Sequence, residues 1–334
     1  MRTLISDVLE RGDVDVVAEA RNGSEAVDVV ADHRPDVVTM DHEMPEMNGV
    51  EAVEEIMSRT PTPVVMLSAH TDENADVTFD ALDRGAVDFF TKPGGEVSTN
   101  MTRHEDQLVE KVRVAAEADV GRGRGAGVAR TARRSDAAYL DRPTLVVGSS
   151  TGGPTEVEAI LSALPVEADL RVLIVQHMPD WFTGRFADRL DRNSDYRVWE
   201  ASDGDRVGGG DAVVAKGGTH MTVANYAGGR LRLRLTDGPA RNGVKPAVDV
   251  TMESVAETID DPLVGVVLTG MGRDGADGIR ELKAAGAATI AQDERTATVF
   301  GMPKQAIETG CVDEVAPTDD VPDEILDAIT EDDP

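Results

Sequence analysis

The strongest constraint on the fold is an alternation of short apolar runs with amphipathic segments. In residues 1–118 the apolar runs have the length of strands buried on both faces, and they lie at 15–20, 35–41, 63–70 and 87–93. The other segments have apolar residues at helical spacing, and they lie at 23–33, 49–59, 75–86 and 103–118. This alternation predicts an α/β domain with a parallel sheet covered by helices.

The same alternation resumes after residue 143 and predicts a second, doubly wound α/β domain over residues 143–330. Its strands are expected in "PTLVVGSS", "LRVLIVQHMP", "DAVVAKGGTHM", "LVGVVLTGMG", "AATIAQD" and "CVDEVAP". The segment "MTVANYAGGRLRLRL" alternates its side chains around a Gly-Gly turn, which predicts an antiparallel hairpin. Residues 119–142 are rich in Gly and Arg, which predicts a flexible linker; a basic strap on an acidic surface is the alternative.

The charge of the chain restricts its partners. It has 63 acidic and 33 basic residues, and the net charge is −30. No basic field remains to neutralise phosphates, so we expect no nucleic-acid partner. The acidic excess is spread along both halves, which indicates a halophilic protein adapted to high salt, where charges are strongly screened. A dedicated cation-binding function is the alternative.

Cysteine content and hydropathy indicate the compartment. The single Cys311 excludes a disulfide framework within one chain and is typical of a reducing environment. The first residues, "MRTLISDVLERGD", are charged too early for a signal peptide, and no apolar run approaches about 18 residues. We therefore expect a soluble cytoplasmic protein without membrane insertion.

Three polar residues of the first domain stand at or after expected strand ends. Asp41 lies in "VVTMDHEMPEMNG", Ser68 in "VVMLSAH" and Lys92 in "DFFTKP". The carboxyl ends of parallel strands meet at one edge of a sheet, so these side chains could hold a phosphoryl group. The carboxylate would attack, and the hydroxyl and ammonium would bind phosphoryl oxygens. The alternative is that Asp41 is an ordinary cap.

These motifs resemble a response-regulator receiver domain with a flavodoxin-like fold. The resemblance implies that Asp41 accepts phosphate from a chemotaxis histidine kinase and belongs to a Mg²⁺ site. It also implies that Ser68 is the switch hydroxyl and that Lys92 contacts the phosphate. Receivers begin with a strand that ends in an acidic Mg²⁺-binding pair, whereas this sequence begins in the first helix, where Asp7 cannot replace the pair.

We therefore expect a sheet whose first strand is missing, with an apolar slot in its place. The resemblance implies Mg²⁺ as the cofactor of phosphorylation if the acidic pair is encoded upstream of Met1. A defective receiver is the alternative.

The second domain carries a candidate nucleophile at its first strand. In "GSSTGG", Gly148, Ser150 and Gly152 fit G-x-S-x-G, a strand–turn–helix elbow that exposes a serine. A phosphate-binding turn and a plain structural turn are the alternatives.

A nucleophilic serine needs a base, and the base needs an orienting acid. His177 follows a strand in "QHMP", so we expect it to be the base, with His220 lining the pocket. Asp274 follows another strand and is the expected acid, whereas Asp277 is expected to cap a helix. The chain order Ser…His…Asp differs from the order in α/β-hydrolases.

The motifs "GSSTGG", "QHMP", "LTGMGRDG" and "QDERTATVFGMP" together resemble the CheB family of chemotaxis protein-glutamate methylesterases. The resemblance implies Ser150 as nucleophile, His177 as base and Asp274 as its partner, with no cofactor for hydrolysis. It also implies an oxyanion hole around the backbone N–H of Met271, with Thr151 beside the nucleophile. Two positions depart from the family pattern: Lys245 replaces an Arg, and Lys216 replaces a Pro.

The family implies hydrolysis of glutamyl methyl esters on methyl-accepting chemoreceptors, deamidation of their glutamines, and a receiver that covers the active-site edge until it is phosphorylated. One alternative is a non-catalytic regulator whose "GSSTGG" loop binds phosphate. Such a loop would not need His177 and Asp274, and it lacks the Lys of a P-loop. Another alternative is a constitutively active esterase with a defective receiver.

Overall fold

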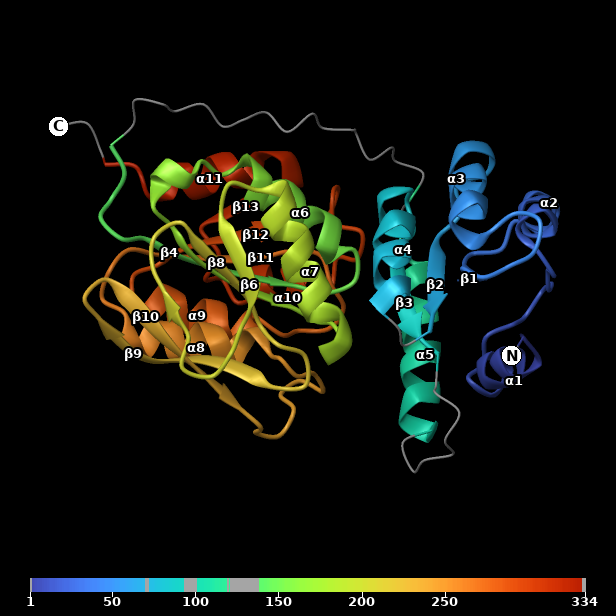
Figure 1. The fold of residues 1–334 in the computed structure, drawn as a ribbon, viewed down its shortest axis with the longest axis horizontal. Helices are drawn as coiled ribbons and strands as arrows, with labels where there is room; N and C mark the ends of the chain where they lie inside the picture. The colour runs from blue at the N-terminus through green and yellow to red at the C-terminus, as the bar shows by residue number, and fades with distance from the viewer. Residues whose placement is uncertain (1, 70–71, 93–100, 119, 121–137, 332–334) are drawn as a thin grey trace. The chain divides into compact units, whose positions relative to one another are not determined.

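The computed structural model describes residues 2–69, 72–92, 101–118, 120 and 138–331 (Figure 1). The chain divides into two compact units, Met1–Gly125 and Ala126–Pro334. Most of the expected linker lies outside the described residues, so its flexibility stays a prediction. No helix in the described ranges is both long and apolar enough to cross a membrane.

The first unit is a three-stranded parallel sheet with helices around it. Its elements are α1 (Arg2–Arg11), α2 (Gly23–His33), β1 (Val38–Asp41), α3 (Gly49–Arg59), β2 (Val64–Ser68), α4 (Asp72–Asp83), β3 (Asp88–Thr91) and α5 (Met101–Ala116). The strand order is β1-β2-β3.

Helix α3 begins with a capping box, in which Asn48 accepts from the N–H of Glu51 and Glu51 accepts from the N–H of Asn48. This local signal explains why α3 begins where the sequence predicts.

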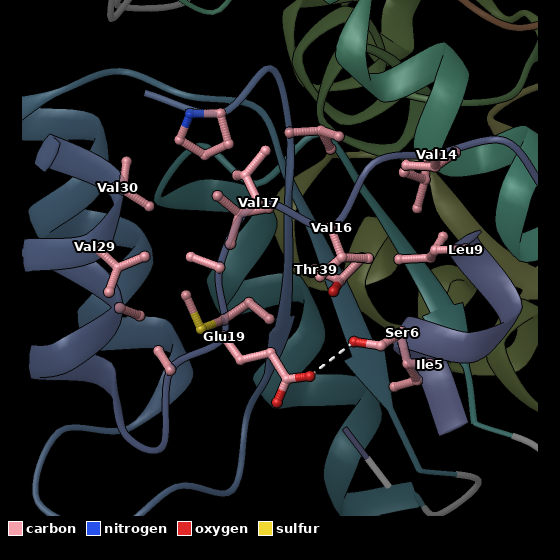
Figure 2. A pocket seen from close by; sticks show the side chains of 18 of the residues that line it. Ile5, Ser6, Leu9, Val14, Val16, Val17, Glu19, Val29, Val30 and Thr39 are labelled. Atoms are coloured by element: carbon pink, nitrogen blue, oxygen red, sulfur yellow. Dashed lines mark hydrogen bonds between the residues drawn. The ribbon is translucent and has the colours of Figure 1, made fainter. Parts of the chain in front are cut away.

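The strand predicted at 15–20 is absent: this segment forms no strand among the described residues. A strand needs a neighbouring backbone for its hydrogen bonds. Among the described residues, no strand pairs with this segment, and β1 pairs with β2 on one side and with no strand on the other. Instead, a cavity of about 530 Å³ is lined both by this segment and by β1. Figure 2 shows Leu9, Val14, Val16 and Val30 around it. The expected apolar slot is therefore present.

The second unit contains ten strands among its described residues. Its helices are α6 (Gly153–Ala163), α7 (Asp180–Asn193), α8 (Val248–Thr258), α9 (Ala276–Ala284), α10 (Met302–Glu308) and α11 (Val321–Ala328). Its strands are β4 (Thr144–Ser149), β5 (Arg171–Gln176), β6 (Arg197–Glu200), β7 (Arg206–Val207), β8 (Asp211–Val214), β9 (His220–Ala227), β10 (Arg230–Thr236), β11 (Leu263–Val267), β12 (Ala288–Gln292) and β13 (Glu314–Ala316). Short 3₁₀ turns lie at Val166–Ala168 and Thr318–Asp320.

Seven of these strands form one parallel sheet in the order β13-β12-β11-β4-β5-β8-β6. The chain starts at β4, runs outward to β6, and returns to the other side of β4 through β11. The junction of β4 with β11 is therefore the topological switch point, where open α/β sheets bind ligands. Helices α6, α7 and α11 cover one face, and α8 and α9 cover the other (Figure 1). The predicted doubly wound architecture is confirmed.

The predicted hairpin is also present. Strands β9 and β10 pair antiparallel, and β7 joins them in a separate three-stranded sheet. Gly228 and Gly229 form the turn with φ of 59° and 76°, a conformation that favours glycine. Strands β6 and β7 were not expected from the sequence, because both are short and lack a continuous apolar run.

Candidate active site

The elbow that carries Ser150 is built from close approaches that only glycine allows. Strand β4 ends at Ser149, Ser150 follows it, and α6 begins at Gly153. A Cβ on Gly148 would lie 2.4 Å from Cγ1 of Val248, the first residue of α8. Gly152 has φ of +78°, and a Cβ there would lie 2.5 Å from Cβ of Thr298. Gly148 is therefore needed for the close packing of β4 against α8, and Gly152 for the sharp turn that follows Ser150.

Hydrogen bonds hold the backbone of the elbow on both sides. The N–H of Ser150 donates to the carbonyl of Thr269 at 3.0 Å. Its carbonyl accepts from Nε2 of Gln176 at 2.8 Å, and the hydroxyl of Thr269 donates to the carbonyl of Thr151 at 2.9 Å. Gln176 and Thr269 were not predicted to belong to the site, although polar residues at the ends of apolar strands are a usable signal. These bonds fix the turn before any substrate binds.

His177 and Asp274 form a direct pair at the same sheet edge. Ser149 is in register with Gln176 on the adjacent parallel strands β4 and β5, so Ser150 and His177 are the next residues of neighbouring strands. The N–H of His177 donates to the carbonyl of Ser149 at 3.0 Å. Nε2 of His177 lies 2.9 Å from Oδ2 of Asp274. Because an ionised carboxylate can only accept, a neutral His177 ring paired in this way carries its proton on Nε2 and has its lone pair on Nδ1.

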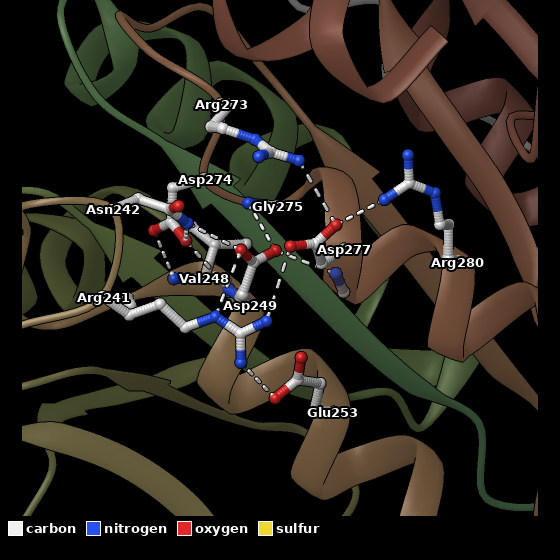
Figure 3. A network of polar contacts seen from close by, with 12 residues as sticks. Arg241, Asn242, Val248, Asp249, Glu253, Arg273, Asp274, Gly275, Asp277 and Arg280 are labelled. Carbon is white, nitrogen blue, oxygen red and sulfur yellow. Dashed lines mark hydrogen bonds and ion pairs between the residues drawn. The ribbon is translucent and has the colours of Figure 1, made fainter. Parts of the chain in front are cut away.

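Asp274 is buried and surrounded by donors (Figure 3). Its carboxylate is 2% exposed. Oδ2 accepts from His177 and from the N–H of Val248 at 2.6 Å, and Oδ1 accepts from Asn242 at 3.1 Å and from the N–H of Asp249 at 3.2 Å. Burial opposes ionisation, but His177 and the two N–H groups outweigh it, so the pKa of Asp274 lies below its ordinary value. The acid is thus held ionised and fixed in place.

His220 is engaged through both ring nitrogens. It is 3% exposed; Nδ1 accepts from the N–H of Ala247 at 3.2 Å, and Nε2 donates to the carbonyl of Pro239 at 3.0 Å. Neither nitrogen is left to take a proton from a serine, which agrees with the choice of His177 as base. That His220 lines the substrate pocket stays a prediction.

The loop that carries Met271 touches Ser150. A Cβ on Gly270 would lie 2.7 Å from Cβ of Ser150, so the two residues are in close contact. The carbonyl of Gly270 accepts from the N–H groups of Gly301 and Met302, which holds the loop in place. Within the described residues, the N–H of Met271 donates to no other group. That N–H is therefore free to donate to another group, and Thr151, which is 5% exposed, follows Ser150 directly.

Asp277 does not cap a helix, contrary to the sequence analysis. The N-cap of α9 is Gly275, and Asp277 lies inside the first turn, where it pairs with Arg273 at 3.4 Å and also with Arg280. An acidic residue in the first turn suits the positive end of the helix dipole, which explains its place.

The two lysines that depart from the family pattern are both paired. Nζ of Lys245 lies 2.6 Å from Oδ1 of Asp237, and Nζ of Lys216 lies 3.3 Å from Oε2 of Glu200.

The first unit brings Asp41 and Lys92 together. Nζ of Lys92 lies 2.6 Å from Oδ2 of Asp41, and the N–H of Glu43 donates to Oδ1 at 3.2 Å. Ser68 ends the neighbouring strand, but its buried hydroxyl accepts from Thr78 at 3.1 Å. The predicted carboxylate, lysine and hydroxyl thus share one sheet edge, and only the first two are in contact.

The described residues of the first unit do not fit a Mg²⁺ site. Mg²⁺ needs several oxygen ligands, and here Asp41 is the carboxylate at the strand edge, already bound to Lys92. No group of three or more His, Cys, Asp or Glu side chains in the described part of the chain is placed to hold a metal ion. Asp41 alone therefore does not make the expected metal site.

Known protein families match the sequences of both units. The family profile for CheB methylesterase matches residues 145–325, and that for the response regulator receiver domain matches residues 1–100. A protein-glutamate methylesterase/protein-glutamine glutaminase of Haloarcula marismortui is 61% identical over 99% of this chain and 95% of its own length. One of Natronomonas pharaonis is 55% identical over 98% of this chain and 95% of its own length.

A solved structure supports the fold of the second unit. The catalytic domain of Thermotoga maritima CheB methylesterase superposes with a TM-score of 0.54 and 39% identity, covering 56% of this chain and 98% of that domain. The agreement of profiles, relatives and structure leads to one assignment. The chain belongs to the CheB family of protein-glutamate methylesterases/protein-glutamine glutaminases, with a receiver domain followed by a methylesterase domain.

Proposed function

We propose that this chain hydrolyses glutamyl methyl esters on chemoreceptors, with Ser150 as nucleophile, His177 as base and Asp274 as its partner. The observation that carries the proposal is the 2.9 Å contact between His177 and the buried Asp274, beside a serine at a sharp strand–helix turn. The names of the relatives support the same reaction class. A phosphate-binding loop would need neither the imidazole nor the carboxylate.

In the first step, Oγ of Ser150 attacks the ester carbon while Nδ1 of His177 takes the hydroxyl proton. The carbonyl oxygen becomes an oxyanion, for which the N–H of Met271 is the proposed donor. Asp274 stabilises the imidazolium through Nε2 without taking its proton. When the tetrahedral intermediate collapses, His177 gives its proton to the leaving methoxide, which departs as methanol.

In the second step, water attacks the acyl-Ser150 and gives its proton to His177. Collapse breaks the bond to Oγ of Ser150, which takes that proton from His177, and frees the glutamic acid side chain, which then loses its own proton to solvent. A glutamine side chain would follow the same route, with ammonia in place of methanol. Deamidation of glutamines is therefore a second activity of the same residues.

We further propose that a chemotaxis histidine kinase phosphorylates Asp41 and thereby regulates the esterase. Support comes from the receiver profile over residues 1–100 and from Lys92, whose ammonium stands at the acceptor carboxylate. Ser68 is the proposed switch hydroxyl, because it ends the adjacent strand β2.

The test is methanol release from chemoreceptor cytoplasmic fragments carrying labelled methyl esters, assayed at high salt. Wild type should release label, and Ser150→Ala should lower the rate by roughly 10³-fold or more. Ser162→Ala is the matched control, since Ser162 is a half-buried serine of α6 whose hydroxyl donates to the carbonyl of Ala159 within the same helix. Equal release by wild type and Ser150→Ala would refute the assignment, and no release by wild type would favour a non-catalytic regulator.

A further inference from the structure

A second buried carboxylate, Asp249, lies behind Asp274. It is in the first turn of α8 and is 0% exposed. Its Oδ1 accepts from the N–H groups of Gly275 and Gly278, each at 2.8 Å. Those glycines follow Asp274 in the chain, so Asp249 holds the segment that carries the proposed triad acid. Asp249 was not predicted from the sequence to have a role in the site.

One amide joins the two carboxylates. Nδ2 of Asn242 donates to Oδ2 of Asp249 at 2.7 Å and to Oδ1 of Asp274 at 3.1 Å. Asn242 and Gly243 form a two-residue turn with φ of 52° and 80°, closed by reciprocal hydrogen bonds between Arg241 and Val244. Asn-Gly is favoured in such a turn because both positions need positive φ. The turn therefore aims the amide at both carboxylates.

One guanidinium faces this acidic cluster from the same turn. Nε of Arg241 lies 3.6 Å from Oδ2 of Asp249, Nη1 lies 2.5 Å from Oε2 of Glu253, and Nη2 lies 3.6 Å from Oδ2 of Asp277. Figure 3 shows its side chain reaching across to these groups. Arg273 and Arg280 pair with Asp277 on its other side, while His177 is the partner on Asp274. Arg241 is therefore the cation that contacts Asp249 directly.

Two carboxylates this close cannot both stay ionised without nearby donors or cations. Burial raises the pKa of Asp249, and the hydrogen bond from the N–H of Gly278 lowers it. The negative charge of Asp274 raises the pKa of Asp249 further. The positive charge of Arg241 partly compensates the charge of Asp249, and Asn242 donates a hydrogen bond to both acids. The electrostatic field at Asp274, and through it at His177, thus depends on this second layer.

We propose that Arg241 and Asp249 form a charge pair that positions Asp274 and sets the electrostatic field in which Asp274 and His177 work. Both are positioning residues, since neither touches the proposed nucleophile. The inference rests on the proposed function for its effect on catalysis, whereas its effect on the titration of the His177 ring does not depend on any activity.

The test compares Arg241→Met, Asp249→Asn and the double variant in the full-length chain. Removing the guanidinium leaves extra negative charge near the imidazole, so the acidic limb of the kcat/KM profile should move to higher pH. Removing the Asp249 charge should move the limb to lower pH. Each shift should be roughly 0.5 to 1 pH unit at an effective dielectric constant near 20. The double variant should return the limb close to the wild-type position.

The control is Arg189→Met. Arg189 pairs with Glu158 at 2.5 Å between α6 and α7, a pair outside the cluster, and its side chain is 16% exposed, against 35% for Arg241. In this variant, the acidic limb of the pH profile of kcat/KM should stay at the wild-type pH. A merely structural role would lower activity in both single variants and most of all in the double variant, without opposite shifts. That pattern, or an unmoved limb, would overturn the proposal.

The second readout is the NMR titration of the His177 ring, assigned with His177→Gln. The ring should titrate at higher pH in Arg241→Met and at lower pH in Asp249→Asn. If wild type hydrolyses no ester but the ring shifts as stated, the proposed function fails and the charge pair stands. If wild type is active and the ring does not shift, the charge pair fails and the proposed function stands.

Discussion

Each unit has an aspartate at or after the carboxyl end of a parallel strand, and the two aspartates differ in exposure and in the number of hydrogen-bond donors around them. In the first unit the side chain of Asp41 is 31% exposed and is bound by Lys92 and one backbone N–H. In the second unit Asp274 is 2% exposed and accepts from four donors. As the proposed phosphoacceptor, Asp41 needs access, whereas Asp274, as the proposed partner of the imidazole, needs fixed donors. The same fold principle thus supports both tasks.

The sheet around Asp41 is also more open than the sheet that carries Ser150. The first unit has a free edge on β1 among its described residues and an apolar cavity of about 530 Å³. In the second unit, β4 lies between β5 and β11 in the sheet and carries the elbow. Side-chain contributions to stability should therefore be larger around Asp274 than around Asp41.

The largest effect is expected for Asp274→Asn. The amide would favour the wrong tautomer of His177, so kcat should fall by roughly 10³- to 10⁴-fold with little change in KM. Single-turnover methanol release measures this directly. Asp203→Asn is the control, because Asp203 accepts only from the N–H of Leu235 on an exposed turn. A loss below tenfold would mean that Asp274 does not orient the base.

Asn242→Ala should have the next largest effect. It removes the donor shared by Asp249 and Asp274 and leaves both carboxylates short of a partner, so kcat/KM should fall by roughly 10- to 100-fold, about 1–3 kcal/mol. Asn225→Ala serves as control, since Asn225 is an exposed residue of β9. If both variants kept wild-type kcat/KM, the donor network would not contribute to the site.

The depressed pKa of Asp274 predicts how acid affects the second unit. A carboxylate whose pKa is lower in the folded state stabilises that state above its unfolded pKa of about 3.9, and this contribution is lost as pH falls through the folded value. The difference in free energy of unfolding between wild type and Asp274→Asn should therefore be largest at neutral pH and shrink toward pH 3. Urea unfolding followed by Trp fluorescence checks this, because Trp181 and Trp199 both lie in the second unit. A constant difference across this range would contradict it.

The smallest effect is expected for Lys92→Met in the first unit. The pair of Lys92 with Asp41 is partly exposed, so its loss should change the free energy of unfolding by less than about 1 kcal/mol. Circular dichroism reports both units, whereas the Trp signal should not move. A loss above about 2 kcal/mol would remove the contrast between the two strand ends.

Local signals explain how much of the fold could be predicted. The helices at 23–33 and 49–59 have the predicted bounds, because Asn22 and Asn48 cap them with side-chain bonds. The strand predicted at 15–20 was wrong because strand formation depends on a neighbour, which no local pattern encodes. The short strands β6 and β7 were missed for the same reason, since their pairing is decided by distant segments.

The candidate site could be predicted only in part. Ser150, His177 and Asp274 each follow an apolar strand, and parallel strand ends meet at one edge, so their convergence could be predicted from order alone. Asn242 and Asp249 lie in a turn and a helix start whose positions depend on tertiary packing. The Asn-Gly turn signal was present, but nothing local shows that its amide reaches two buried carboxylates.

The most direct test of the central claim is to label the full-length protein with a fluorophosphonate and locate the adduct by mass spectrometry. The reagent reacts with a serine whose hydroxyl is activated by a base. The account predicts one adduct, on Ser150, formed far more slowly in His177→Gln and in Asp274→Asn. An adduct on another serine, or equal labelling in all three proteins, would contradict it.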